Sequence, residues 1–420
     1  MNLLPGRPPR VTFLTFNVNG IGGIARVVIN VANALSRTHE VEILSILRSN
    51  PTSTFPIDEG VKVSTLFDAT RAGVRRRNQN RASRGAVLSA MPAADPVLSR
   101  EPKVNALIEQ RLQRRLATTD ADVVISTRPS LHWAAVAMTR PNVGLIGWDH
   151  LNFPTRYENA RMGRLLDEVV PQLDAWVTLT EEDRKDYLSR LGGQAPRIEV
   201  LRNSSGWVAP VERPARRARV VVGAGRLEHR KGFDRAIEAW RPLAVSHPDW
   251  QLHIYGSGPL ERELREHVAA AGLQDVVRLM GYTKDFKQVL AHADAFLMTS
   301  RAEGFPMVLV EAMSQGTPIV TMDCPRGPAE IVTTGRNGVL VDDGDIPGVT
   351  AALDKLLNDD ELRRRMGEQA MDDSREYQME HIVARWGELI DAVSRPSAGR
   401  RAVRRAVARP VHALRRLRHG

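Results

Sequence analysis

Two acidic residues, Glu303 and Glu311, flank a segment whose composition suits a phosphorylated sugar ligand. The apolar run 295–299 predicts a strand, and helical spacing from about Met307 predicts a helix just after the turn. A helix N-terminus offers backbone N–H groups and the positive end of a dipole, which suits a diphosphate. Gly304 lets the backbone approach a ligand closely. Carboxylates at 303 and 311 can accept hydrogen bonds from sugar hydroxyls.

A plainer interpretation of the same segment stays open. In it, Glu303 only caps the helix and Glu311 lies on a solvated helix face. The segment alone does not decide between the two interpretations.

Two cations follow the strand predicted at about 219–223. Arg226 and Lys231 lie in the turn between Gly225 and Gly232. They could neutralise a leaving diphosphate, the guanidinium through its planar fork and the ammonium as a point charge. The alternative is an exposed basic turn. The predicted phosphate cradle in the same half of the chain favours the binding interpretation.

Three further motifs carry weaker signals. Gly22 and Gly23 follow the first predicted strand and form a second phosphate-loop candidate, but they lack the full dinucleotide spacing, so a tight packing turn is the alternative. Asp120 and Asp122 have the spelling of a metal motif but lead into a predicted buried strand, so we interpret them as a turn and assign no metal. Cys324, the single cysteine, excludes an intrachain disulfide and fits a reducing compartment; it is interpreted as a packing residue.

These candidate residues need a scaffold of alternating strands and helices. Short β-rich runs occur at 11–16, 41–46, 122–126, 143–147, 175–179, 219–223, 251–255, 276–280, 295–299 and 318–321. Helical patterns separate most of them, which predicts an α/β fold with parallel sheets covered on both faces. With 420 residues, two domains are expected.

The expected domain boundaries follow from the composition. The expected segments are an α/β domain over 1–207, a second over 208–375, a helical segment over 376–394 and a basic tail over 395–420; helical pattern returns from Glu361 to Val393. Segment 68–103, rich in Arg, Ala, Ser and Pro and containing the Arg71 to Arg84 cluster, is expected to be a surface excursion of the first domain.

The net charge of +10 is mostly a property of the tail. Segment 395–420 holds nine arginines and no acid, so the rest of the chain is nearly neutral. Val403, Val407, Val411 and Leu414 recur at helical spacing, which predicts a basic amphipathic segment on an anionic membrane surface; a solvated tail is the alternative. No apolar run is long enough to span a bilayer, and no signal peptide is recognisable. The protein is expected to be cytoplasmic and peripheral at the inner face of the cell membrane.

The motifs together resemble the retaining family 4 glycosyltransferases. Glu303 to Glu311 matches that family's Glu-x7-Glu motif, and the turn 225–232, the glycines at 22–23 and the segment 335–341 are similar to family motifs in the same order. The loop 323–331 resembles the version found in wall teichoic acid and lipopolysaccharide glycosyltransferases, which often use UDP-hexoses. The resemblance covers residues 11–394. It implies a GT-B fold: two Rossmann-like domains face each other across a cleft, with the acceptor-side domain over 1–207 and the nucleotide-sugar-binding domain over 208–375. A C-terminal helix, 376–394, would cross back to the first domain.

The resemblance also implies a role for each matching residue. Glu303 would hold donor-sugar hydroxyls, Glu311 the ribose, and Arg226 with Lys231 the departing diphosphate. His150 is similar to the family's first-domain histidine near the reacting sugar, although a lone histidine is more often structural. The remaining predicted contacts to sugar and phosphate are Gly22, Gly23, Gly304, Phe305, Pro306 and Met307.

The implied reaction is a retaining hexosyl transfer without an enzyme nucleophile. The acceptor hydroxyl would attack from the face that the diphosphate leaves, and the diphosphate itself could take the proton. No cofactor or metal is expected beyond the nucleotide-sugar co-substrate, a UDP-hexose. The expected acceptor is a glycan, a polyol phosphate or a lipid-linked molecule of the cell envelope.

Three other functions are compatible with parts of the sequence. A soluble storage-polymer or disaccharide synthase would have the same fold, and so would a sugar-nucleotide epimerase. The positive charge also raises the possibility of a nucleic-acid-binding protein. Against this, the charge is concentrated at one terminus, and no recognition motif or aromatic stacking pattern is present, so nucleic acid is not an expected partner.

Overall fold

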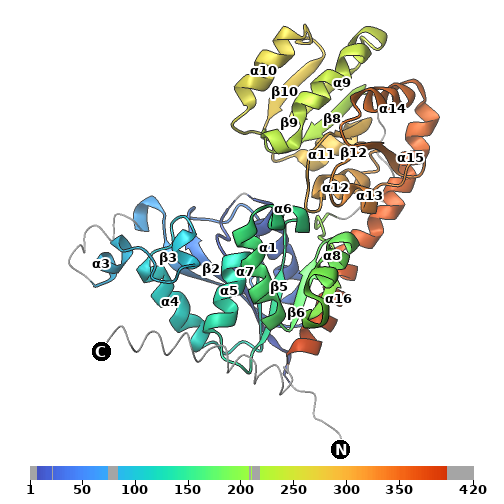
Figure 1. Cartoon of the computed structure of the whole chain (residues 1–420). Helices are drawn as coiled ribbons and strands as arrows, with labels where there is room; N and C mark the ends of the chain where they lie inside the picture. The colour runs from blue at the N-terminus through green and yellow to red at the C-terminus, as the bar shows by residue number, and fades with distance from the viewer. Residues whose placement is uncertain (1–6, 21, 74–83, 208–209, 211–217, 395–420) are drawn as a thin grey trace, which may run out of the picture. The chain divides into compact units, whose positions relative to one another are not determined.

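The chain folds into two compact units, unit 1 (residues 1–201 with 379–420) and unit 2 (residues 202–378). A computed structural model describes residues 7–20, 22–73, 84–207, 210 and 218–394 (Figure 1). The arginines between 75 and 81 and the predicted basic tail lie outside the described residues. Within the described residues, no helix is both long and apolar enough to cross a bilayer.

Unit 1 is built on a seven-stranded parallel sheet in the order β3-β2-β1-β4-β5-β6-β7. Its strands are β1 (Arg10–Thr15), β2 (Glu40–Arg48), β3 (Val61–Asp68), β4 (Val123–Ser126), β5 (Gly144–Trp148), β6 (Ala175–Thr178) and β7 (Arg197–Val200). The central strands are buried on both faces, which explains their continuous apolar sequences. The strand order reverses between β1 and β4, the switch point where such sheets bind ligands.

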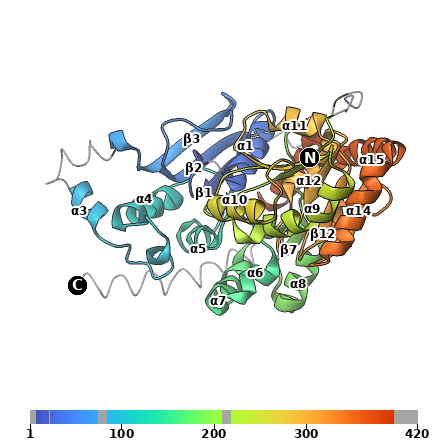
Figure 2. The same ribbon diagram turned by 90° about the horizontal axis from the view of Figure 1, so that it is seen from above.

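Helices cover both faces of this sheet. They are α1 (Gly23–Leu35), α3 (Arg84–Ala90), α4 (Ala106–Ala117), α5 (Pro129–Met138), α6 (Phe153–Glu158), α7 (Ala160–Val169), α8 (Glu181–Leu191) and α16 (Met379–Val393). Residues of α4, α5, α7 and α8 share one apolar core, whereas α16 packs on α1 and β5. Figure 2 shows α4 and α5 on one side of strands β1–β3 and α1 on the other.

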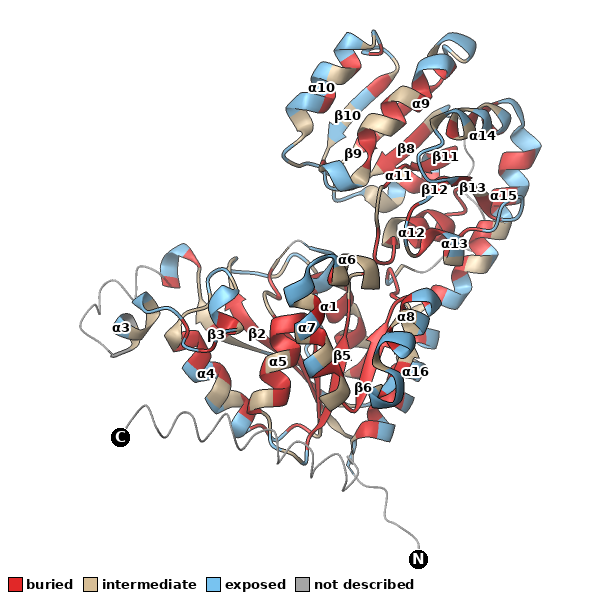
Figure 3. Ribbon diagram, in the orientation of Figure 1, coloured by how far each residue is buried: buried red, intermediate tan, exposed pale blue. Residues whose placement is uncertain are grey.

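Unit 2 repeats the design with a six-stranded parallel sheet in the order β10-β9-β8-β11-β12-β13. The strands are β8 (Val220–Ala224), β9 (Gln251–Tyr255), β10 (Val277–Gly281), β11 (Ala295–Met298), β12 (Ile319–Asp323) and β13 (Gly338–Asp342). The helices are α9 (Phe233–Ser246), α10 (Glu261–Ala270), α11 (Phe286–His292), α12 (Met307–Ser314), α13 (Pro328–Ile331), α14 (Ile346–Asn358) and α15 (Asp360–Asp373). Buried residues concentrate in the central strands of each unit (Figure 3). The predicted α/β class with two Rossmann-like units is confirmed.

Three strands, β3, β7 and β13, were not predicted. Each lies at an edge of its sheet. An edge strand pairs on one side only and keeps polar residues, as the partly exposed β3 and β7 show. It therefore lacks the continuous apolar run by which the central strands are recognised.

The helical pattern predicted over 361–393 is two helices, α15 and α16. The short 3-10 helix Ser374–Tyr377 and the extended Gln378 separate them. Helix α15 packs within unit 2, whereas α16 packs in unit 1, so the chain does return to the first unit through a C-terminal helix as expected.

The excursion expected over 68–103 is only partly a surface loop. Its last third packs on unit 1: Leu98 is 1% exposed, and the Asp95 carboxylate accepts a hydrogen bond from the indole of Trp133 at 3.2 Å. Glu109 of α4 also accepts the backbone N–H of Ala94 at 2.6 Å. The prediction missed this packing because single buried residues such as Leu98 form no periodic pattern.

Candidate active site

The carboxyl ends of β8 and β11 meet at the switch point of the unit 2 sheet. The two strands are neighbours, and the sheet order reverses between them. The turn 225–232 follows β8, and the segment 299–306 follows β11. The two segments singled out from the sequence therefore lie side by side, where doubly wound sheets bind ligands.

An ion pair joins these two segments. The Lys231 ammonium lies 2.6 Å from Oε1 of Glu303, and the Ser300 hydroxyl donates to the same oxygen at 2.6 Å. Glu303 is only 5% exposed. The carboxylate is therefore fixed by two donors, and Lys231 is held at the same position.

Gly232 makes the approach of the two segments possible. Its φ of +65° is left-handed, and a Cβ added there would lie 2.0 Å from the carbonyl oxygen of Thr299. The Thr299 hydroxyl in turn donates to the carbonyl of Gly232 at 2.8 Å. Only glycine fits this contact, which presents Lys231 to Glu303.

Helix α12 begins directly after Pro306, as predicted. Within the described residues, no side chain caps this end. Glu311, in the second turn, is 5% exposed. The interpretation of Glu311 as a residue of a solvated helix face is therefore wrong.

The predicted contact segment before α12 is firmly packed. Gly304, Phe305 and Pro306 are buried and Met307 is half-buried. Gly327, with a φ of +97°, lies behind them: a Cβ added there would be 2.6 Å from the Pro306 ring. The loop after β12 thus supports the segment from behind.

Arg226 is placed differently from Lys231. Its side chain is 71% exposed, and its Nε lies 3.5 Å from a carboxylate oxygen of Glu228. An exposed pair of this kind contributes little to stability. A role of Arg226 toward a diphosphate stays a prediction.

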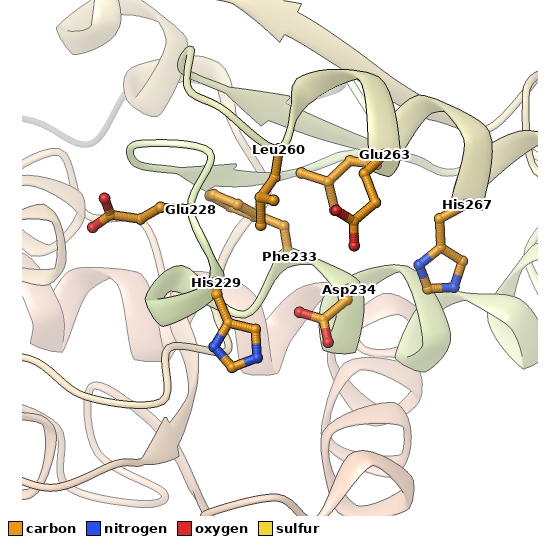
Figure 4. A pocket seen from close by; sticks show the side chains of 8 residues that line it. Glu228, His229, Phe233, Asp234, Leu260, Glu263 and His267 are labelled. Carbon is orange, nitrogen blue, oxygen red and sulfur yellow. The ribbon is translucent and has the colours of Figure 1, made fainter.

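A small cavity lies beside the same turn (Figure 4). Its lining residues are Glu228, His229, Phe233, Asp234, Leu260, Glu263, Leu264 and His267. Asp234 is paired with Arg301 at 2.6 Å and His267 with Glu238 at 2.5 Å. At about 80 Å³ the cavity is far smaller than a typical ligand pocket, so we do not assign it to a nucleotide sugar.

In unit 1, the glycine loop and His150 lie at the carboxyl edge of the sheet. Gly22 precedes α1 and Gly23 opens it; a Cβ added at either would meet nothing within 4 Å. Packing inside the protein therefore does not require these glycines. They leave open space at a helix N-terminus, which suits the approach of a ligand.

His150 follows β5 by two residues. Its ring lies against Trp148, with centroids 4.4 Å apart. Burial lowers the pKa of His150 to about 3, with Asp149 opposing and Arg156 adding to the effect. The imidazole is therefore neutral at physiological pH.

Sequence reasoning missed Arg128, which lies at the switch point of unit 1. It lies two residues after β4, and its guanidinium stacks on the ring of Phe16, which follows β1, at 4.5 Å. Glu101 lies 3.5 Å from it. The available signal was a cation two residues after the strand predicted at 122–126.

Asp120 and Asp122 both contact Arg10, the first residue of β1. Asp122 accepts the N–H of Arg10 at 2.9 Å, and Asp120 pairs with the Arg10 guanidinium at 3.0 Å. Within the described residues no cluster of three potential metal-binding side chains occurs.

Cys324 is expected to be unreactive in the folded protein. It is 1% exposed, and burial, reinforced by the charge of Glu303, raises its pKa to about 12. At pH 8 the native thiol should react with a disulfide reagent about 1000-fold more slowly than a free thiol, because so little thiolate is present. Reaction in urea should be fast, and equal rates in both states would contradict the packing interpretation.

Comparisons with known proteins agree with these features. Residues 21–204 match the model of Glycosyltransferase Family 4, and residues 210–373 match that of Glycosyl transferases group 1. An exopolysaccharide phosphotransferase of Streptomyces coelicolor is 32% identical over 94% of this chain, which spans 42% of that longer protein. A poly(ribitol-phosphate) alpha-N-acetylglucosaminyltransferase of Staphylococcus aureus is 23% identical over 81% of this chain and 69% of its own length.

A solved structure shares the fold. The crystal structure of a variant of S. aureus TarM in complex with fondaparinux, alpha-GlcNAc-glycerol and UDP aligns with a TM-score of 0.71 and 15% identity, over 91% of this chain and 99% of TarM. The sequence matches two consecutive glycosyltransferase domain models. The structure has two doubly wound sheets and the returning helix α16, as this fold requires. The chain therefore belongs to the glycosyltransferases that join a family 4 domain to a group 1 domain, and its fold is GT-B.

Proposed function

We propose that this protein is a retaining glycosyltransferase that moves a hexose from a UDP-sugar to a cell-surface polymer or a lipid-linked acceptor. The observation that carries the proposal is the ion pair of the half-buried Lys231 with the buried Glu303 at the switch point of unit 2, beside the start of α12. The presence of UDP in the TarM complex supports the choice of donor base.

Lys231 and Glu303 have different roles in the proposed reaction. Glu303, oriented by Lys231 and Ser300, accepts hydrogen bonds from hydroxyls of the donor sugar. Lys231 has three N–H donors, and the bond to Glu303 uses one. The positive charge therefore also faces the leaving diphosphate, together with the N-terminus of α12.

Glu303 is not the nucleophile in this mechanism. Two donors on one carboxylate oxygen stabilise its charge and weaken its attack on carbon. Instead, the acceptor oxygen forms the new bond to the anomeric carbon as the bond to the diphosphate breaks, on the same face. The diphosphate takes the acceptor proton, so the configuration is retained without a covalent enzyme intermediate.

On the acceptor side, one cation of unit 1, Arg128, supports an anionic acceptor. Arg128 lies at the switch point, stacked on Phe16. We propose a polyol phosphate or a lipid-linked glycan at the inner face of the cell membrane. The acetylglucosaminyltransferase relative is named for such a phosphate polymer.

A donor screen tests the proposal directly. UDP-hexoses should raise the melting temperature of the full chain more than GDP- or ADP-sugars do, because ligand binding stabilises the folded state. Mass spectrometry should detect a glycosylated product with a polyol-phosphate acceptor. Neither stabilisation nor turnover with any nucleotide sugar would contradict the proposed function, and release of UDP with an isomerised sugar and no acceptor product would indicate an epimerase.

Deleting residues 395–420 tests the membrane location. The full chain should sediment with vesicles that contain anionic phosphatidylglycerol, and the shortened chain should not. Each lost arginine near such a surface removes about 1 kcal/mol of attraction. If the shortened chain still sediments, the tail is not the membrane-binding segment; if the full chain does not sediment and keeps its full activity without vesicles, the membrane proposal fails and a soluble synthase of the same fold becomes the better explanation.

A further inference from the structure

Asp149, the neighbour of His150, is the centre of a buried polar network in unit 1. It is 2% exposed, and its carboxylate accepts Nε and Nη2 of Arg156 at 3.0 and 2.5 Å. The Tyr187 hydroxyl donates to its other oxygen at 2.9 Å. Burial alone would raise the pKa of Asp149, but Arg156 outweighs it and holds that pKa below its usual range. The carboxylate is thus charged and fully engaged.

The same network fixes the backbone around His150. The N–H of Asp149 donates to the carbonyl of Val177, which extends β5, and its carboxylate accepts the N–H of Leu151 at 3.2 Å. Further along, Asp183 accepts the N–H of Phe153 at 2.9 Å. The peptide units on both sides of His150 are therefore tied to β6 and α8.

Aromatic rings fix the imidazole itself. The His150 ring lies against Trp148, and Trp148 meets the edge of Trp386 with centroids 4.8 Å apart. Trp386 belongs to α16 and is fully buried. The returning C-terminal helix thus supports His150 through one intervening ring.

Stability alone is a poor explanation for this arrangement. A buried ion pair gains little over apolar packing, because both charges lose their hydration. Yet Arg156 and Asp149 occupy the core beside His150, whose Nε2 is buried without a hydrogen-bond partner among the described residues. A fully hydrogen-bonded polar network of this kind makes its surroundings rigid, and here the surroundings include the segment that carries His150.

We propose that Asp149, held by Arg156 and Tyr187, is a positioning residue for His150, and that Trp386 of α16 completes the support through Trp148. The network fixes the position of the His150 ring at the carboxyl end of β5, and the role of that ring toward the sugar stays part of the proposed function. This inference rests on the proposed function. It assigns no substrate contact to Asp149, Arg156, Tyr187 or Trp386.

The variants Asp149→Asn and Tyr187→Phe test the network in the full chain. Both keep the shape of the side chain; the second removes a single hydrogen bond and so is the milder one should Asp149→Asn fail to fold. For the folded variants, kcat should fall at least about tenfold while KM for the UDP-sugar changes less than about twofold, since donor binding rests on unit 2. The ¹⁵N signals of the His150 ring, measured without ligand, should shift or broaden.

Asp174→Asn is the matched control. Asp174 is also a buried carboxylate of unit 1, but it accepts the N–H of Leu145 at 2.8 Å, at the opposite end of β5. This variant should lower the melting temperature as the others do and leave both kcat and the His150 signals unchanged.

Two results would separate the possible failures. If Tyr187→Phe and Asp149→Asn leave the His150 signals and kcat at the level of Asp174→Asn, the positioning inference is overturned. If the wild-type protein neither binds nor turns over a nucleotide sugar, the proposed function fails, whereas shifted His150 signals in the variants would still show that the network holds the ring.

Discussion

Replacing Glu303 by glutamine should reduce kcat by about 100- to 1000-fold, the range seen when one preorganised polar group is removed from an active site. Glutamine has nearly the same shape but no charge, and it can no longer balance the ammonium of Lys231 at 2.6 Å. The sugar hydroxyls then lose the carboxylate that accepts their hydrogen bonds, and Lys231 is no longer held where it can neutralise the diphosphate. Initial rates with a UDP-hexose, over a range of donor concentrations, measure the effect.

Loss of stability must be separated from loss of chemistry in this experiment. Breaking a fully buried ion pair by removing one partner costs about 3–5 kcal/mol; Lys231 is 18% exposed, so the loss of stability for Glu303→Gln should be smaller than this. The double variant Lys231→Met with Glu303→Gln removes both charges and should regain much of the free energy of unfolding. Its kcat should stay low, since the site has lost both groups.

A surface pair provides the comparison. Asp249 pairs with Arg219 at 2.6 Å in the same unit, but both side chains are more than half exposed. Asp249→Asn should change neither stability nor rate measurably. If Glu303→Gln keeps kcat within about threefold of the wild type while remaining folded, Glu303 does not serve the reaction and the site must be sought elsewhere.

The sequence predicts which residues lie at the candidate site better than it predicts the contacts between their side chains. Continuous apolar runs identified the central strands, and the parallel topology then placed Lys231 and Glu303 at one sheet edge. That their side chains form an ion pair depends on the left-handed Gly232 and its contact with Thr299, which no local pattern encodes. The edge strand β13 escaped for the same reason as the other edge strands, because half-buried residues carry a weak signal.

The sequence could not predict residues whose role depends on contacts with distant parts of the chain. Arg128 follows a predicted strand, but its place in the site depends on stacking over the ring of Phe16, which lies 112 positions earlier in the chain. Asp149 adjoins the predicted His150, yet its partners Arg156 and Tyr187 come from two different helices. Tertiary packing brings such groups together, and spacing along one segment cannot reveal it.

Replacing Gly232 by alanine should destabilise unit 2 and abolish activity together. Two effects combine: a φ of +65° disfavours any Cβ, and the added carbon would lie 2.0 Å from the carbonyl oxygen of Thr299. The first costs about 1–2 kcal/mol. The second cannot be relieved by a side-chain rotation, since both atoms near the clash are held by backbone, so the segments carrying Lys231 and Glu303 must separate.

Gly272→Ala isolates the first effect, because Gly272 has a nearly identical φ of +70° and an added Cβ there meets nothing within 4 Å. Urea unfolding followed by circular dichroism should show a loss of about 1–2 kcal/mol for Gly272→Ala and at least about 3 kcal/mol for Gly232→Ala, in which a steric clash adds to the strain. Binding of UDP should weaken only in the second. Equal losses in the two variants, with UDP binding intact, would mean that the close approach of Gly232 to Thr299 does not hold the site together, and the proposed role of the Lys231–Glu303 pair would lose its structural basis.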